Sequence, residues 1–295
     1  MKLHGRVAIV TGAAGGLGRS HALYLAAQGA RVVVNDLQAA AAEAVVAEIE
    51  AAGGEAIALV AAVNDEASVR GMVEAVMAKW GRIDILVNNA GILRDKSFDK
   101  STIADFRMVV DVHLMGSAIC CHAVWPIMRD QGYGRIVMTT SSSGLYGNFG
   151  QANYGAAKMA LVGLMQTLAL EGEKYGIRVN SLAPTAATKM TEGVLSDEAL
   201  KMLDPGFVSP GLLALVGDHA PTRAILCAGA GHFATADVTL TQGLYLGADA
   251  GEALVANWDQ VADRHDDLVP AYGFTQAERE EASARAHAFA PVAAE

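Results

Sequence analysis

The sequence predicts an α/β protein with one Rossmann-type, doubly wound parallel sheet of about seven strands. Short β-branched runs alternate with longer apolar helical stretches from Val7 to Ala228, a spacing typical of parallel βαβ units. A glycine-rich turn joins the first of these strands to the first helix. A chain of 295 residues with 52% hydrophobic content can also bury a core of this size.

The formal net charge of -10 argues against nonspecific binding to nucleic acid or to an anionic membrane. It leaves open an anionic small ligand held by a local cluster of cations. The three cysteines, Cys120, Cys121 and Cys227, form no Cys-x-x-Cys pair, so we predict no metal site. No uninterrupted apolar stretch reaches about 18 residues. With no signal-like start, the expectation is a cytoplasmic protein that does not bind membranes.

The first strand, Val7–Val10, runs into the glycine-rich turn Thr11–Gly18, and an apolar helix follows through Gln28. A strand, a glycine-rich turn and a helix in this order present free backbone N–H groups to a pyrophosphate. Glycine permits both the tight turn and the close approach of the phosphate. This stretch is therefore the candidate dinucleotide-binding turn.

Asp36 follows the second strand, Arg31–Asn35, and lies 18 residues beyond Gly18. An acidic residue near this spacing binds the adenosine ribose hydroxyls of a dinucleotide. Its charge repels a 2′-phosphate, so Asp36 favours NAD over NADP. The alternative is an aspartate that caps the helix beginning near Ala39.

The later elements continue the alternation of strands and helices. Small and amide residues at 88–91 close the fourth strand and suit a cofactor crevice, although an Asn-rich turn is the alternative. Pro126 is expected to bend or break a long helical segment. Further strands are predicted at 56–60, 83–87, 135–140, 177–182 and 224–228, and further helices at 39–52, 65–80, 101–130 and 152–171.

Two later regions depart from this pattern. Residues 185–220 have little periodicity and are predicted as either a mobile lid over the site or an ordinary surface excursion. We expect a dinucleotide-binding domain over 1–250, which includes this segment. Residues 251–295 are expected to form a helical C-terminal extension, either an oligomer contact or a frayed end.

Ser141, Tyr154 and Lys158 are the candidate catalytic residues. Tyr154 and Lys158 are four residues apart, which places them on one face of a helix. A strand that ends at Ser141 would bring its hydroxyl to the same point. A lysine ammonium should lower the pKa of the tyrosine, ordinarily about 10, towards working pH. The alternative is an interfacial tyrosine beside a solvated lysine, because Tyr-x-x-x-Lys is common.

These motifs, in this order, resemble the short-chain dehydrogenase/reductase family over Val7 to about Leu240. Within it, the chain is similar to the (3R)-hydroxyacyl-CoA dehydrogenase units of peroxisomal multifunctional enzymes of type two. The family resemblance rests on Thr11-Gly12-x-x-x-Gly16-x-Gly18, Asn88-Asn89-Ala90-Gly91, Ser141 and Tyr154-x-x-x-Lys158. The closer resemblance rests mainly on Asn88–Phe98, Val112–Ser117 and Tyr146–Tyr154.

The resemblance implies an NAD-dependent oxidoreductase that oxidises a secondary alcohol, with a (3R)-3-hydroxyacyl-CoA as the leading small-molecule substrate. Free hydroxysteroids or other small alcohols are the alternative, and a non-catalytic dinucleotide sensor is a third reading. A homodimer or homotetramer is also implied. The implied catalytic residues are Ser141, Tyr154, Lys158 and His113; the implied cofactor-binding residues are Gly12, Gly16, Leu17, Gly18, Asp36, Val63, Asn89, Ala90, Gly91, Tyr154, Lys158, Pro184 and Thr188.

Three positions depart from the family pattern. His113 stands where an asparagine commonly supports a proton relay to the lysine, and it is either a participant or an ordinary core histidine. Ala62 replaces an aspartate that faces adenine, which leaves the Val63 backbone as a contact. Thr185 replaces the glycine after Pro184, so we expect the loop around the nicotinamide to follow a different path.

Overall fold

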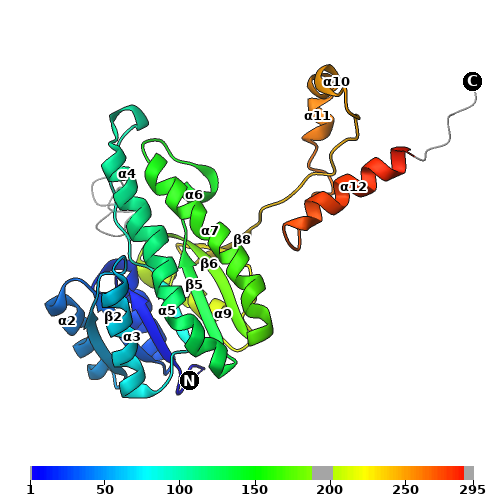
Figure 1. Ribbon diagram of the computed structural model, residues 1–295. Coiled ribbons are helices and arrows are strands. Elements are labelled where there is room, and N and C mark those ends of the chain that lie inside the picture. The colour runs from blue at the N-terminus through cyan, green and yellow to red at the C-terminus, as the bar shows by residue number, and fades with distance from the viewer. Residues whose placement is uncertain (1, 188–201, 289–295) are drawn as a thin grey trace, which may run out of the picture. The chain divides into compact units, whose positions relative to one another are not determined.

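The computed structural model describes residues 2–187 and 202–288 (Figure 1). The chain divides into two compact units, 1–236 and 237–295. The boundary lies earlier than the one expected after residue 250, because the last strand of the sheet ends at Ala236 and no helix follows before Gly251. The stretch 188–201, which is part of the segment 185–220 expected as a lid, lies outside the described residues.

The first unit contains the predicted doubly wound sheet. The strand order is β3-β2-β1-β4-β5-β6-β7-β8, and all neighbours are parallel except β7 and β8. The order reverses direction between β1 and β4, which places a crevice at their carboxyl ends. The strands are β1 Val7–Thr11, β2 Arg31–Asp36, β3 Glu55–Val60, β4 Ile85–Asn88, β5 Gly134–Thr139, β6 Ile177–Thr185, β7 Ile225–Gly229 and β8 His232–Ala236.

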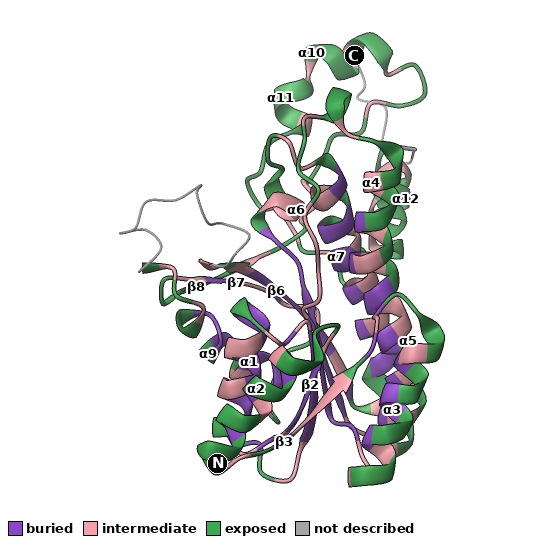
Figure 2. Cartoon of the chain, turned by 90° about the vertical axis from the view of Figure 1, so that its left-hand side faces the viewer, coloured by how far each residue is buried: buried purple, intermediate pink, exposed green. Residues whose placement is uncertain are grey.

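Helices cover both faces of the sheet, and two apolar cores lie beneath them (Figure 2). One core joins the sheet to α3, α5 and α7, and the other joins it to α1, α2 and α9. The helices of this unit are α1 Gly16–Ala27, α2 Ala39–Ala51, α3 Glu66–Trp80, α4 Ile103–Val110, α5 Gly116–Gln131, α6 Ser142–Tyr146, α7 Ala152–Gly172 and α9 Pro210–Val216.

The long helical segment is interrupted, but not where proline was expected to interrupt it. Pro126 lies inside α5, so the prediction of a break there is wrong. The backbone instead widens into one π turn, Asp111–Met115, between α4 and α5. A proline removes one helical hydrogen bond, and packing of α5 on the sheet compensates for that loss. Single π turns often lie at functional sites.

By length and composition, one helix among the described residues could cross a membrane, at 103–131. The sequence predicted no uninterrupted apolar stretch long enough to span a membrane. In its most apolar window 39% of the residues are buried, and Cys120, Val124 and Met128 belong to the core beneath the sheet. A core helix passes the same test, so this is weak evidence for a membrane span.

The second unit, 237–295, is small and mainly helical. Leu240 and Leu268 pair antiparallel and join its two halves. Asp267 accepts hydrogen bonds from Thr239 and Arg264, each at 3.0 Å. The helices are α10 Gly251–Ala256, α11 Trp258–Val261 and α12 Phe274–Ala288.

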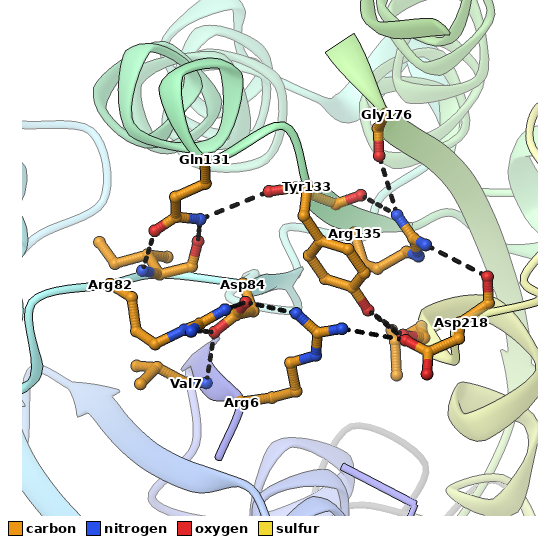
Figure 3. A network of polar contacts seen from close by, with 12 residues as sticks. Arg6, Val7, Arg82, Asp84, Gln131, Tyr133, Arg135, Gly176 and Asp218 are labelled. Carbon is orange, nitrogen blue, oxygen red and sulfur yellow. Dashed lines mark hydrogen bonds and ion pairs between the residues drawn. The ribbon is translucent and has the colours of Figure 1, made fainter. Parts of the chain in front are cut away.

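A polar network ties the amino-terminal edge of the sheet together, at the opposite end of the strands from the crevice (Figure 3). Its centre is the Asp84 carboxylate, which is fully buried. The carboxylate accepts hydrogen bonds from Arg6 at 3.1 Å, from the Val7 backbone at 2.9 Å and from Arg82 at 2.6 and 2.8 Å. The Tyr133 ring lies beneath the Arg6 guanidinium, 3.6 Å from the ring centroid.

We expect Asp84→Ala to lower the free energy of unfolding by about 3–5 kcal/mol, because it leaves buried donors without their acceptor. Urea denaturation monitored by circular dichroism measures this loss. The matched control is Asp130→Ala, which removes an exposed pair with Arg129 and should change stability by less than about 1 kcal/mol. Equal, small losses in both variants would show that the network contributes little.

Candidate active site

A cleft of about 750 Å³ opens at the carboxyl ends of the parallel strands. Its walls come from the turns that follow β1, β2, β4, β5 and β6, and from the start of α7. This is where open α/β sheets bind their ligands. Of the predicted site residues, the cleft is lined by Gly12, Gly16, Leu17, Gly18, Asp36, Asn89, Ala90, Gly91, His113, Ser141, Tyr154, Lys158 and Pro184.

The glycine-rich turn is packed too closely to accept side chains at Gly12 and Gly18. A Cβ atom on Gly18 would lie 2.1 Å from the Gly12 carbonyl oxygen. A Cβ atom on Gly12 would lie 2.8 Å from the Ala90 Cα atom, and Gly12 also has a φ of +62°. No side chain caps the amino terminus of α1. The turn therefore keeps backbone N–H groups available at a helix start, which suits an anionic group.

Thr11 and Asn89 join this turn to the end of β4. Asn89 donates through its amide to the Thr11 and Gly12 carbonyls, at 2.9 and 3.1 Å. The buried Thr11 hydroxyl accepts from the backbone N–H groups of Asn89 and Ala90, both at 3.0 Å. Sequence reasoning assigned no role to Thr11, although it begins the glycine-rich motif.

The Asp36 carboxylate lies at the end of β2 and lines the cleft. Its oxygens accept hydrogen bonds from the backbone of Ala14 at 3.1 Å and of Gln38 at 3.2 Å. The capping alternative is not realised, because the N-cap of α2 is Gln38 and has no side-chain cap. Asp36 is thus held against the glycine-rich turn with lone pairs left for ribose hydroxyls.

Two predicted cofactor contacts are not part of the described cleft. Val63 is buried, and its side chain packs against Gly116. A Cβ atom added to Gly116 would lie 2.7 Å from the Val63 Cγ2 atom. It is not among the residues that line the cleft. Thr188 lies outside the described residues. After Leu182, β6 continues through Pro184 to Thr185, and both of these residues line the cleft.

The structure brings Ser141, Tyr154 and Lys158 together. Ser141 directly follows β5 and begins α6, whereas Tyr154 and Lys158 lie on α7. Ser141 shares a side-chain hydrogen bond with Tyr154. The buried Lys158 ammonium donates to the Thr139 carbonyl at 2.6 Å and lies 5.4 Å from the centre of the Tyr154 ring.

The electrostatics of this group differ from the sequence-based expectation. Burial raises the pKa of Tyr154 above its ordinary value, and the hydrogen bond with Ser141 lowers it in part. Burial also lowers the pKa of Lys158 to about 7. The expected lowering of the Tyr154 pKa by Lys158 is not seen, and removal of the phenol from water is the largest effect on this pKa.

His113 lies in the π turn, 2% exposed, with its ring edge-on to Tyr154 at a centroid distance of 5.3 Å. Its Nε2 atom lies 2.8 Å from the Ile92 carbonyl, while its Nδ1 atom is buried without a hydrogen-bond partner among the described residues. Burial, and then the charge of Lys158, lower the pKa of His113 to about 3. The imidazole is thus neutral around pH 7, and only one of its two ring nitrogens has a hydrogen-bond partner among the described residues.

One wall of the cleft was not assigned from the sequence. It is formed by Leu93 and Asp95 from the loop after β4, and by Asn148, Phe149 and Gln151 before α7. Phe149 is 91% exposed at the rim. The sequence offered one indication of this wall, because both segments lie in stretches that carry the closer family resemblance. Neither segment contains a recognised catalytic motif, so no role was predicted for it.

Comparisons with known proteins agree with this geometry. The chain is 45% identical over 275 residues to the peroxisomal hydratase-dehydrogenase-epimerase of Saccharomyces cerevisiae, covering 88% of this chain and 30% of that relative. The full-length structure of peroxisomal multifunctional enzyme type 2 from Drosophila melanogaster matches with a TM-score of 0.82 and 37% identity, over 97% of this chain and 51% of that one. A 7α-hydroxysteroid dehydrogenase complexed with NADH and 7-oxo glycochenodeoxycholic acid matches with a TM-score of 0.73 and 32% identity, over 78% of this chain and 95% of that one.

The expected cytoplasmic location is contradicted by these comparisons. Relatives in two fungi, a fly and a slime mould are all named as peroxisomal enzymes. Net charge and the absence of an apolar leader do not distinguish these compartments, because such addresses are read by receptors and not set by the fold.

The chain spans about a third of the length of the multifunctional relatives in yeast and fly. It therefore corresponds to one part of those proteins, and the cleft described above lies within that part. The short chain dehydrogenase family matches residues 6–199, which include the glycine-rich turn, Ser141, Tyr154 and Lys158. The chain belongs to the short-chain dehydrogenase/reductase family of oxidoreductases.

Proposed function

We propose that this protein oxidises a secondary alcohol to a ketone with NAD, and that its substrate is a (3R)-3-hydroxyacyl-CoA, converted to the 3-oxoacyl-CoA. The observation that carries the proposal is the meeting of Ser141, Tyr154 and Lys158 in one cleft with a glycine-rich turn. A hydroxyl, a phenol and an ammonium at one point can move a proton to or from a carbon-bound oxygen.

The residues present fit a dinucleotide. Gly12 and Gly18 line the cleft, and close packing keeps side chains off both positions, so the backbone N–H groups of the turn stay available to a pyrophosphate. Asp36 presents a carboxylate at the position that suits adenosine ribose hydroxyls, and its charge opposes a 2′-phosphate. We therefore assign NAD and not NADP. Asn89, Ala90, Gly91 and Pro184 supply the facing wall.

The chemistry that bound NAD would supply in this cleft is acceptance of the hydride that leaves the carbinol carbon. Tyr154 takes the hydroxyl proton as the carbonyl forms, and returns a proton in the direction of reduction. Ser141 hydrogen-bonds the same oxygen while its charge changes. Lys158 would hold a ribose hydroxyl of the cofactor, and its pKa of about 7 permits it to pass a proton on. His113 supports the Tyr154 ring from its edge.

Acyl-CoA as the substrate class rests on the relatives, whose names place a dehydrogenase beside a hydratase. If hydration precedes dehydrogenation, the oxidation of the 3-hydroxyacyl-CoA proposed here would be one step in the β-oxidation of fatty acids or steroid side chains. Arg94 and Lys96 are exposed beside the cleft, each 3.8 Å from Asp105, and are candidates to meet the CoA phosphates.

A free hydroxysteroid is the second candidate substrate. It is favoured by the likeness to a hydroxysteroid dehydrogenase and by the exposed Phe149 ring at the rim of the cleft. A non-catalytic dinucleotide sensor is disfavoured, because a sensor has no use for all of Ser141, Tyr154 and Lys158.

NAD reduction followed at 340 nm separates these substrates. Matched (3R)- and (3S)-3-hydroxyacyl-CoAs of several chain lengths are compared with free hydroxysteroids. Turnover confined to the (3R)-CoA esters is the expected result. Turnover of free steroids alone would retain the dehydrogenase and exclude the CoA substrate.

The choice of cofactor depends on Asp36. We expect Asp36→Ser to raise the ratio of kcat/KM for NADP over NAD about tenfold or more, since it removes a charge that faces the 2′-phosphate. Steady-state kinetics with each cofactor measures this ratio. Glu43→Ser, on the exposed face of α2, is the control and should leave the ratio unchanged. A ratio that Asp36→Ser does not alter would remove Asp36 from cofactor selection.

We also propose that the protein is a homodimer or homotetramer. Ile103, Met108 and Met115 are exposed along α4 and the π turn, and Met159 and Leu170 are exposed on α7. A second copy of the chain would cover these apolar side chains. Light scattering after size-exclusion chromatography tests this assembly, and a monomer at micromolar concentration would contradict it.

A further inference from the structure

Two of the stretches that carry the closer family resemblance, Asn88–Phe98 and Tyr146–Tyr154, are joined to each other in the structure. The Lys96 backbone N–H donates to the Gly150 carbonyl at 2.9 Å. The buried Asn153 amide donates to the Arg94 carbonyl at 3.0 Å, and its oxygen accepts from the Tyr154 backbone at 2.7 Å. The loop after β4 is thus fastened to the first turn of the catalytic helix.

A side-chain pair completes this connection. The Gln151 amide nitrogen donates to the Asp95 carboxylate at 2.6 Å. Its amide oxygen accepts from the Ser143 hydroxyl at 2.8 Å and from the Asn148 amide at 3.2 Å. Reversal of the amide would set its oxygen against a carboxylate and its NH₂ group against another donor, so these partners fix its orientation.

The Asp95 carboxylate lines the cleft, with no cation paired to it in the part of the chain that the structure describes. The nearest cations in sequence, Arg94 and Lys96, each lie 3.8 Å from Asp105 instead. Among residues 2–187 and 202–288, no ion pair joins Asp95 to a cation. The hydrogen bond from the neutral Gln151 therefore holds this carboxylate without neutralising it.

We propose that Asp95 and Gln151 are positioning residues for the reaction: together they lock the 92–97 loop onto α7 and hold a carboxylate that acts on Tyr154 through space. This inference rests on the proposed function for the role of Tyr154. It gives a role in the reaction to two residues that line the cleft and that, within the described structure, form no hydrogen bond with Ser141 or Lys158.

Four groups around Tyr154 bear on its titration or its ring. Ser141 hydrogen-bonds it, while the His113 ring meets Tyr154 edge-on and is uncharged. Lys158 lies over the ring and is directed at a backbone carbonyl. The Asp95 charge raises the pKa of Tyr154, in addition to the larger effect of burial. Removing that charge must therefore lower the pKa of Tyr154.

Asp95→Asn tests the charge, because the asparagine oxygen can still accept from Gln151. We expect the midpoint of Tyr154 titration to fall by about half a pH unit, as a partly screened charge several ångströms away would cause. Below that midpoint, oxidation should be about threefold faster than in the parent protein. NMR of tyrosine labelled with ¹³C at Cζ follows the titration, with the Tyr154 resonance assigned by its absence in Tyr154→Phe.

Two further variants separate charge from structure. Asp99→Asn, in the exposed turn Phe98–Lys100 outside the cleft, should leave the midpoint and the kinetics unchanged. Gln151→Met keeps the length of the side chain but breaks the connection, and should raise KM for the alcohol about fivefold or more as the loop loosens.

An unchanged Tyr154 midpoint in Asp95→Asn would overturn the inference. A changed KM in Asp95→Asn without a changed pH profile would also overturn it, since the carboxylate would then contact substrate directly. Failure of the parent protein to oxidise any secondary alcohol would instead refute the proposed function. The NMR titration is independent of turnover, so it judges the action of Asp95 on Tyr154 in either case.

Discussion

Tyr154→Phe should lower kcat for alcohol oxidation by about 1,000-fold or more while NAD still binds with nearly unchanged affinity. The substitution removes one oxygen atom, which is the atom that accepts the substrate proton. It keeps the aromatic ring that packs edge-on against His113, so the fold around the site should persist. Turnover at 340 nm and NAD titration by fluorescence measure the two effects separately.

The control for this variant is Tyr175→Phe. Tyr175 lies in the short turn that follows α7, outside the cleft, so the same loss of a hydroxyl should leave kcat within about twofold. If Tyr154→Phe keeps most of its activity, the phenol is not the proton acceptor. If it loses NAD binding as well, the tyrosine acts mainly in holding the cofactor.

Gly18→Ala should abolish measurable NAD binding and destabilise the fold. The new methyl group would lie 2.1 Å from the Gly12 carbonyl oxygen and 2.5 Å from the Asn89 amide nitrogen. Neither atom can retreat freely, because Asn89 is itself bonded to the Thr11 and Gly12 carbonyls. Overpacking of this kind costs about 1–3 kcal/mol, and the turn must change shape to accept it.

Gly71→Ala is the matched helical control. A Cβ atom on Gly71 meets nothing within 4 Å, and this residue lies in the interior of α3. That substitution should raise stability by up to about 1 kcal/mol through helix propensity and leave NAD binding intact. Isothermal titration and urea denaturation compare the two variants. Tight NAD binding by Gly18→Ala would show that the turn does not hold the pyrophosphate.

The arrangement of the catalytic residues could be predicted because it depends on local geometry. Strands that alternate with helices force a parallel sheet, and the carboxyl ends of β1, β4 and β5 then meet at one edge. Ser141 lies two residues after the end of β5, and the four-residue spacing of Tyr154 and Lys158 fixes their shared helix face. Each step uses only neighbours in sequence.

Features that depend on tertiary packing were missed. Strand β8 is short and mostly exposed at the edge of the sheet, so it shows no buried alternation. The π turn at Asp111–Met115 does not change the apolar periodicity of the sequence, so the sequence did not predict it. Pro126 is a strong helix-breaking residue, but it does not end its helix. In both cases packing on the sheet overrides the local signal.

The electrostatics of the site were predicted with the wrong sign for a similar reason. A lysine four residues from a tyrosine suggests a lowered tyrosine pKa, but the sequence does not show how deeply both are buried. Burial raises the pKa of Tyr154 and lowers that of Lys158. The hydrogen bond between Asp95 and Gln151 could not be predicted from the sequence either, because 56 residues separate the two.

Transfer of deuterium tests the central claim most directly. (3R)-3-hydroxyacyl-CoA deuterated at the carbinol carbon is incubated with NAD and the protein, and the NADH formed is analysed by mass spectrometry. Our account predicts one deuterium per NADH from the (3R) ester, none from the (3S) ester, and almost no NADH from Tyr154→Phe. Absence of labelled NADH from the (3R) ester, or equal labelling from both esters, would contradict it.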